Sequence, residues 1–130
     1  MNPISHITLG TNDAARAADF YDAVLGVLDW ARIPKPPEKP PAYCKNGKPP
    51  YLFLCLPENG LPATWGNGTH IAFAADSREQ VRRFYARATE CGGADEGAPG
   101  PRPHYGEHYY AAYIRDLDGN KLQAVCHSPA

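Results

Sequence analysis

The sequence predicts an α+β fold built from two βαβββ repeats. A shift of 64 residues aligns His6 with His70. The same shift aligns Tyr21 with Tyr85, so the histidine and the tyrosine are 15 residues apart in both copies. Because the chain has 130 residues, this offset divides it almost evenly. Internal similarity of this kind predicts a duplicated structural unit.

The first repeat begins with an apolar strand over Ile4–Leu9. Asn12 or Asp13 then offers a side-chain oxygen to the first amides of a helix. The helix has an apolar stripe at positions i, i+3, i+4 and i+7, and Gly26 is expected to end it. The stripe consists of Ala17, Phe20, Tyr21 and Val24. Short strands are expected near residues 27–33, 42–45 and 51–56.

The second repeat follows the same plan. A strand over Thr69–Ala74 precedes Ser77 and Gln80, which have the spacing of a capping box. The helix stripe consists of Val81, Phe84, Tyr85 and Ala88, and Gly92 and Gly93 follow it. Strands are expected near residues 95–98, 109–115 and 121–126. The last two flank the turn sequence DLDGN, which predicts a hairpin.

The connections between these elements are rich in proline and glycine. The stretch PKPPEKPP, residues 34–41, is expected to be an extended surface loop, because proline is excluded from helix interiors and central strands. We expect one domain over residues 1–130, with the first repeat at about 1–57, a linker at 58–67 and the second repeat at about 68–130.

Composition narrows the functional classes. The net charge is −1, which disfavours nucleic acid or an anionic membrane as a partner. No apolar run approaches the roughly 20 residues of a membrane span, and the first ten residues do not resemble a signal peptide. We therefore expect a cytoplasmic protein. No pair of the four cysteines has CxxC spacing, so free thiols are expected.

Three stretches resemble a known family. They are HITLGTNDAARAADFYDAVLG, GTHIAFAADSREQVRRFY and YAAYIRDLDGNKLQAV, and they lie between residues 6 and 125, so the resemblance extends over nearly the whole chain. They are similar to the vicinal-oxygen-chelate superfamily of glyoxalases, type I extradiol dioxygenases, fosfomycin-resistance enzymes and bleomycin-binding proteins. The resemblance implies the glyoxalase/dioxygenase fold, in which two βαβββ units form curled mixed sheets around a cavity, often across a homodimer.

The resemblance also implies a metal site. In the family, side chains from the first and last strand of each unit hold a divalent metal, and the matching positions here are His6, His70 and Gln123. Zn, Ni, Fe or Mn would suit the imidazoles. However, metal-binding relatives carry a carboxylate where Gln123 stands, and Tyr51–Leu56 contains no acid, so Phe53 or Leu54 takes the fourth position. We therefore expect the metal to be weakly held or absent.

The stretch RPHYGEHYYAAY, residues 102–113, contains further candidates. His104, His108 and Tyr113 could act as catalytic groups, because imidazole and phenol transfer protons. The loop could bind an anionic or aromatic substrate, and Lys121 could meet a substrate carboxylate. The alternative is that the tyrosines only pack the sheet.

Two functions stay open. One is an enzyme, a metal-assisted lyase or dioxygenase of the glyoxalase type acting on a small oxygen-bearing molecule near His6 and His70. Gln123 cannot serve as its base, because an amide does not accept a proton at neutral pH. The other is a metal-free protein that binds and sequesters a small molecule, as bleomycin-binding relatives do. The missing carboxylates favour the second function, and the histidine pair favours the first.

Overall fold

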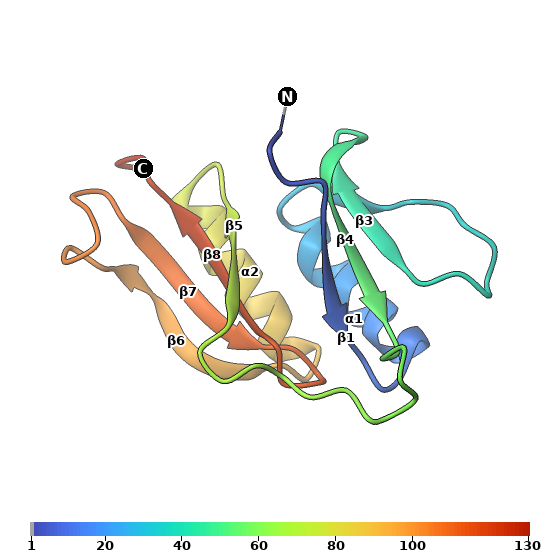
Figure 1. The fold of residues 1–130 in the computed structure, drawn as a ribbon. Coiled ribbons are helices and arrows are strands. Elements are labelled where there is room, and N and C mark those ends of the chain that lie inside the picture. The colour runs from blue at the N-terminus through green and yellow to red at the C-terminus, as the bar shows by residue number, and fades with distance from the viewer. Residues whose placement is uncertain (1) are drawn as a thin grey trace.

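The computed structural model describes residues 2–130 and contains two four-stranded sheets (Figure 1). The first sheet has the order β1-β4-β3-β2 and the second the order β5-β8-β7-β6. The elements are β1 His6–Gly10, α1 Ala14–Gly26, β2 Trp30–Arg32, β3 Ala42–Lys45, β4 Lys48–Cys55, β5 His70–Ala74, α2 Arg78–Glu90, β6 Ala94–Pro101, β7 Tyr110–Arg115 and β8 Lys121–Cys126. In each sheet the first and fourth strands pair in parallel and the other neighbours pair antiparallel.

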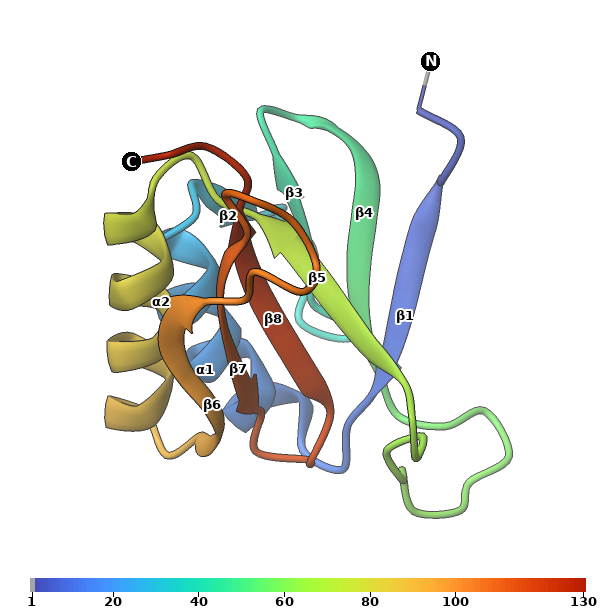
Figure 2. The same cartoon turned by 90° about the vertical axis from the view of Figure 1, so that its left-hand side faces the viewer.

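Both helices cover the same side of the molecule, and each sheet leaves its other face open (Figures 1 and 2). The apolar stripes predicted for the helices are buried in the core, except that Tyr85 is only half-buried. Phe20, Phe84 and Val24 are at most 2% exposed. Burial of such side chains contributes roughly 1.5 to 3 kcal/mol each, so this layer is the main source of stability.

A side-chain oxygen caps the start of each helix. Asp13, not Asn12, caps α1, and its side chain accepts a hydrogen bond from the Arg16 amide at 3.0 Å. Ser77 caps α2 in the same way. Gly92 has a φ of +96°, the left-handed conformation that commonly follows a helix. Gly26 is the last residue of α1 but lacks a positive φ, so the residue that turns the chain there is Asp29, with a φ of 67°.

A hydrogen-bonded clamp joins the two halves through the turn between β7 and β8. Asp118 accepts a hydrogen bond from the Thr11 hydroxyl at 2.6 Å and another from the Asn12 amide at 3.0 Å. Next to it, the Tyr21 hydroxyl donates to the buried Asp116 carboxylate. The end of the second repeat therefore fixes the segment that follows β1.

The predicted fold class is confirmed: two βαβββ units form curled mixed sheets, although these sheets do not close around a cavity within one chain. Three strands differ clearly from the prediction, and one of them, β6, extends over Ala94–Pro101 instead of residues 95–98. β4 begins at Lys48, because Asn46 and Gly47, both with positive φ, form a two-residue hairpin turn. β2 is only three residues long. No helix among the described residues is long and apolar enough to cross a membrane.

Candidate functional site

The open face of the second sheet contains several of the predicted site residues. On β5, Phe73 points into the core, so strand alternation directs His70 and Ala72 to the open face. Ala72 is the register partner of Gln123 on β8. This pairing explains why a histidine near the start of one strand meets a side chain 53 residues later.

A chain of hydrogen bonds crosses this face. His70 Nε2 lies 3.1 Å from Gln123 Oε1, and Gln123 Nε2 donates to the Tyr109 hydroxyl. An amide oxygen only accepts, so His70 Nε2 must carry the proton in this arrangement. Turning the amide over would make it donate to the His70 nitrogen lone pair instead. In both arrangements the nitrogen is occupied, and Gln123 is only 1% exposed.

Tyr113 lies beside this chain in a cationic setting. The His70 ring meets it edge-on at 6.0 Å between centroids. Lys121 Nζ lies 5.2 Å from the Tyr113 centroid, and the Arg102 guanidinium lies 5.7 Å from it. Burial and the neighbouring Tyr109 raise the pKa of the Tyr113 phenol. At neutral pH the Tyr113 hydroxyl is therefore a donor of hydrogen bonds and not a base.

The first sheet presents a different set of side chains. His6 is exposed on β1, its Nδ1 lies 3.0 Å from the Ser5 hydroxyl, and its ring meets Phe53 edge-on at 5.4 Å. The register pairs Thr8 with Phe53, so Phe53 takes the position that corresponds to Gln123 in the second sheet. Leu54 is 1% exposed and belongs to the core.

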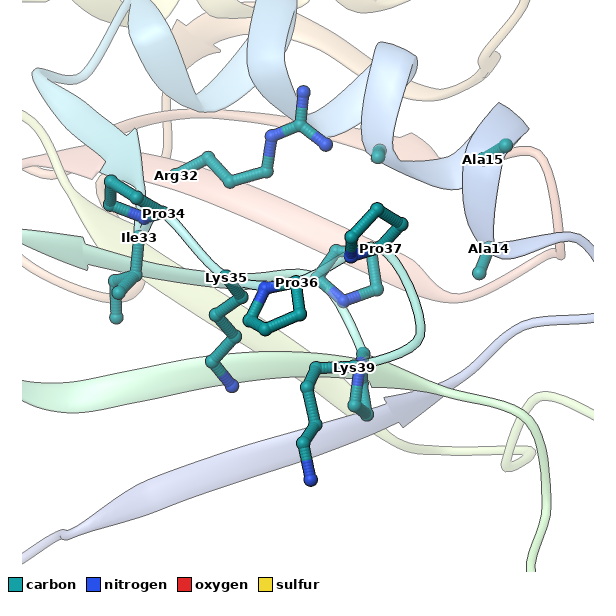
Figure 3. A pocket seen from close by; sticks show the side chains of 12 residues that line it. Ala14, Ala15, Arg32, Ile33, Pro34, Lys35, Pro36, Pro37 and Lys39 are labelled. Carbon is teal, nitrogen blue, oxygen red and sulfur yellow. The ribbon is translucent and has the colours of Figure 1, made fainter.

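The proline-rich loop borders two hollows. A cavity of about 620 Å³ lies between the loop and α1 (Figure 3). A second, of about 720 Å³, lies between the loop and the first sheet, where Thr8 and Cys55 line it. In Figure 3, Lys35 and Lys39 extend from the loop away from α1, and Lys35 Nζ lies 4.6 Å from the Phe53 centroid. Burial raises the pKa of the Cys55 thiol, so this cysteine is a weak nucleophile at neutral pH.

The two histidines of the loop are not hydrogen-bonded to His70, Gln123 or Tyr109. His104 is exposed and its ring lies 4.1 Å from the Tyr105 ring. His108 Nε2 lies 3.8 Å from the Glu107 carboxylate. Tyr105 packs on Tyr109 at 5.3 Å between centroids, so the loop reaches the site through its tyrosines.

The donor set does not fit a divalent metal. At the four family positions only His6 and His70 are imidazole or acidic groups, and His70 Nε2 is already hydrogen-bonded to Gln123. Gln123 is neutral, and the fourth position is the apolar Phe53. Within residues 2–130, no three His, Cys, Asp or Glu side chains form a group that could hold a metal ion. Catalytic zinc normally has three protein ligands, and that requirement is not met.

Two residues at this site, Tyr109 and Lys35, were not among the predicted catalytic or metal-binding residues. Tyr109 and Tyr113 are four residues apart, so in an extended strand they point to the same face of the sheet. This spacing indicates that Tyr109 lies on the same side as Gln123. Lys35 gave no signal, because a proline-rich loop has no periodicity from which the direction of a side chain follows.

Comparison with known proteins gives a consistent result. The family model for the Glyoxalase/Bleomycin resistance protein/Dioxygenase superfamily matches residues 3–124. A glyoxalase/bleomycin resistance protein from Albidiferax ferrireducens T118 is 36% identical, with a TM-score of 0.85 over 98% of this chain and 100% of that one. No protein with curated annotation matches the chain significantly.

Two further solved structures differ in what their names describe. Lactoylglutathione lyase from Agrobacterium tumefaciens is 25% identical, with a TM-score of 0.66 over 97% of this chain and 94% of that one. TnmS3, an antibiotic binding protein from Streptomyces sp. CB03234, is 20% identical, with a TM-score of 0.68 over 98% of both chains, and this likeness shows the fold alone. The family match extends from before β1 into β8 and therefore includes both repeats. The chain belongs to the Glyoxalase/Bleomycin resistance protein/Dioxygenase superfamily.

Proposed function

We propose that this protein binds a small molecule on the open faces of its sheets without a divalent metal. The hydrogen bond between His70 Nε2 and Gln123 Oε1 is the observation that carries the proposal. It occupies the nitrogen that a metal would need, and the amide is held in turn by Tyr109. Aromatic groups with a few polar anchors are the usual lining of a ligand site, and this face has that composition.

The test is metal affinity, measured with a variant that restores the missing charge. Protein without a histidine tag is incubated with Zn²⁺, Ni²⁺ or Fe²⁺ and dialysed, and its metal content is measured by inductively coupled plasma mass spectrometry. We expect less than about 0.1 metal ion per wild-type chain, because a buried amide competes for His70. Gln123→Glu adds a carboxylate beside His70 and should increase metal affinity by about 10-fold or more.

One result would contradict this proposal directly. Near-stoichiometric metal in the wild-type protein, lost in His6→Ala and His70→Ala, would mean that the amide gives way to an ion. His127→Ala is the matched control, since this exposed histidine packs on Tyr109 and lies outside the proposed ligand set.

A lyase of the glyoxalase type is the second candidate, supported by the 25% identity to the Agrobacterium lyase. It would need a base, and the raised pKa of Tyr113 makes that residue unsuitable at neutral pH. His104 and His108 would have to supply it from the loop. Formation of lactoylglutathione by the wild-type protein, abolished in the double variant His104→Ala/His108→Ala, would favour the lyase over a binding protein.

We also propose a homodimer, as the family resemblance implies. Both open faces lie on the side away from the helices, so a second chain could close over them (Figure 2). Light scattering during gel filtration should then give twice the mass of one chain. A monomer at micromolar concentration would contradict this proposal without affecting the metal test.

A further inference from the structure

A lysine lies over an aromatic ring on the open face of each sheet. Lys35 Nζ is 4.6 Å from the centroid of Phe53, and Lys121 Nζ is 5.2 Å from that of Tyr113. A histidine meets the edge of each ring, at 5.4 Å in the first sheet and 6.0 Å in the second. We call these groups the two trios: His6, Phe53 and Lys35, and His70, Tyr113 and Lys121.

Only the histidines of the trios are related by the repeat. Lys35 comes from the proline-rich loop, whereas Lys121 begins β8. The register counterpart of Phe53 is Gln123 and not Tyr113. The same combination of groups therefore arises from different elements on the two faces.

The lysines of the trios have no acidic partner. Among the described residues, the one lysine in an ion pair is Lys45, with Asp76. Glu38 and Glu58 line the cavity beside the loop, and neither forms an ion pair with Lys35. The ring attracts the ammonium only weakly compared with a charge-assisted hydrogen bond. Each ammonium therefore keeps N–H groups for an anion from outside the chain.

The arginines near the second trio are already occupied by protein groups. Arg102 donates to the carbonyl oxygens of Ala98 and Gly100 at 2.9 and 2.8 Å. Arg115 pairs with Glu96 at 2.7 Å. These contacts leave Lys121 as the cation of this face that can bind a ligand. Arg102 adds positive charge near the ring without needing to touch the ligand.

We propose that the trios select a small aromatic molecule that carries an anionic group. The lysine binds the anion, and the half-buried ring and the histidine contact the aromatic body of the ligand. This inference rests on the proposed small-molecule function. No member of the trios lines the cavity of about 720 Å³, but Thr8 and Cys55, each two residues along its strand from His6 or Phe53, do. Its volume falls within the usual size of a ligand pocket.

The test compares two fluorescent probes of similar shape, anilinonaphthalene sulfonate, an anion, and N-phenyl-1-naphthylamine, which is neutral. We expect the wild-type protein to bind the anion at least about 10-fold more tightly. Lys35→Met and Lys121→Met should each weaken binding of the anion by about 3- to 10-fold and leave the neutral probe within about twofold. Added salt should weaken only the anionic probe.

Lys48→Met is the matched control, because Lys48 is exposed on β4 and belongs to neither trio. An equal loss in this control, or equal affinity of the wild-type protein for both probes, would overturn the anion preference alone. If neither probe binds the wild-type protein, the proposed small-molecule function falls together with this inference. Thermal melts establish that each variant is folded.

Discussion

Tyr21 connects the first helix to the last hairpin through one buried hydrogen bond. Its hydroxyl donates to Asp116, which also accepts from the amides of Asp118 and Asn120. Tyr21 is 1% exposed, so no water replaces the hydroxyl when it is removed. A hydrogen bond to a charged group contributes about 1.5 to 3 kcal/mol.

We therefore expect Tyr21→Phe to lower the free energy of unfolding by about 1.5 to 3 kcal/mol. Urea denaturation at pH 7 measures this change. Tyr105→Phe is the control, and because Tyr105 is 63% exposed it should change stability by less than about 0.5 kcal/mol. Equal effects of the two substitutions would show that the buried hydrogen bond adds nothing to stability.

For single residues, the sequence predicted the sheet face on which a side chain lies better than it predicted the partners of that side chain. The repeat drew attention to His6 and His70, and both lie on open sheet faces. Their partners Phe53 and Tyr113 depend on strand register, which the sequence did not determine. Lys35 could not be predicted, since its direction depends on the path of a loop.

Gly93 and Gly26 both lie near helix ends, but only Gly93 is tightly packed. A Cβ at Gly93 would lie 2.9 Å from the carbonyl oxygens of Ala88 and Arg115, so α2 and β7 depend on its absence. A Cβ at Gly26 would meet nothing within 4 Å, and its φ is not positive.

We expect Gly93→Ala to destabilise the protein by about 1 to 3 kcal/mol, because the new methyl group must push two elements apart. Gly26→Ala should instead stabilise it by about 0.5 to 1 kcal/mol, since alanine is the better helix residue. Thermal unfolding followed by circular dichroism compares the two variants. A rise in melting temperature for Gly93→Ala would mean that this contact is looser than the structure indicates.

Helices and strands in which hydrophobic residues recur at a regular spacing were predicted well from the sequence. Both helices have the expected apolar faces, and β3 and β8 have the expected bounds. The prediction placed the start of β4 too late, because the two prolines Pro49 and Pro50 disguised a strand that continues to the Asn46–Gly47 turn. The Asn-Gly pair is itself a hairpin signal that should have outweighed them.

For the molecule as a whole, two buried tyrosines predict how stability depends on alkaline pH. Burial, reinforced by Asp116, raises the pKa of Tyr21 well above 10, and burial with a hydrogen bond to Asp22 does the same for Tyr43. In the unfolded chain both phenols ionise near pH 10, whereas in the folded chain they keep their protons. Their contribution is therefore present below pH 10 and is lost as the pH rises above it.

We expect the free energy of unfolding to fall above pH 10 by up to about 1.4 kcal/mol per pH unit for each of these tyrosines. Urea denaturation at pH 8, 10 and 11 gives the slope. Tyr21→Phe should make the slope shallower, because one of the two groups is removed. An unchanged slope in this variant would contradict the role of Tyr21 in the alkaline transition.

The arrangement of the two units was only partly predictable. The repeat predicted two similar sheets, because each copy carries its own strand and helix pattern. The clamp between Thr11 and Asp118 joins residues 107 apart in the sequence, and no local pattern indicates it.

The clamp also determines when a newly synthesised chain can complete the folding of its amino-terminal half. The segment after β1 is made first, but its partners Asp116, Asp118 and Asn120 lie 95 to 110 residues further along the chain. These hydrogen bonds therefore cannot form until residues 116–120 have been synthesised. A nascent chain stalled before residue 116 should remain more sensitive to protease at residues 10–13 than the released protein.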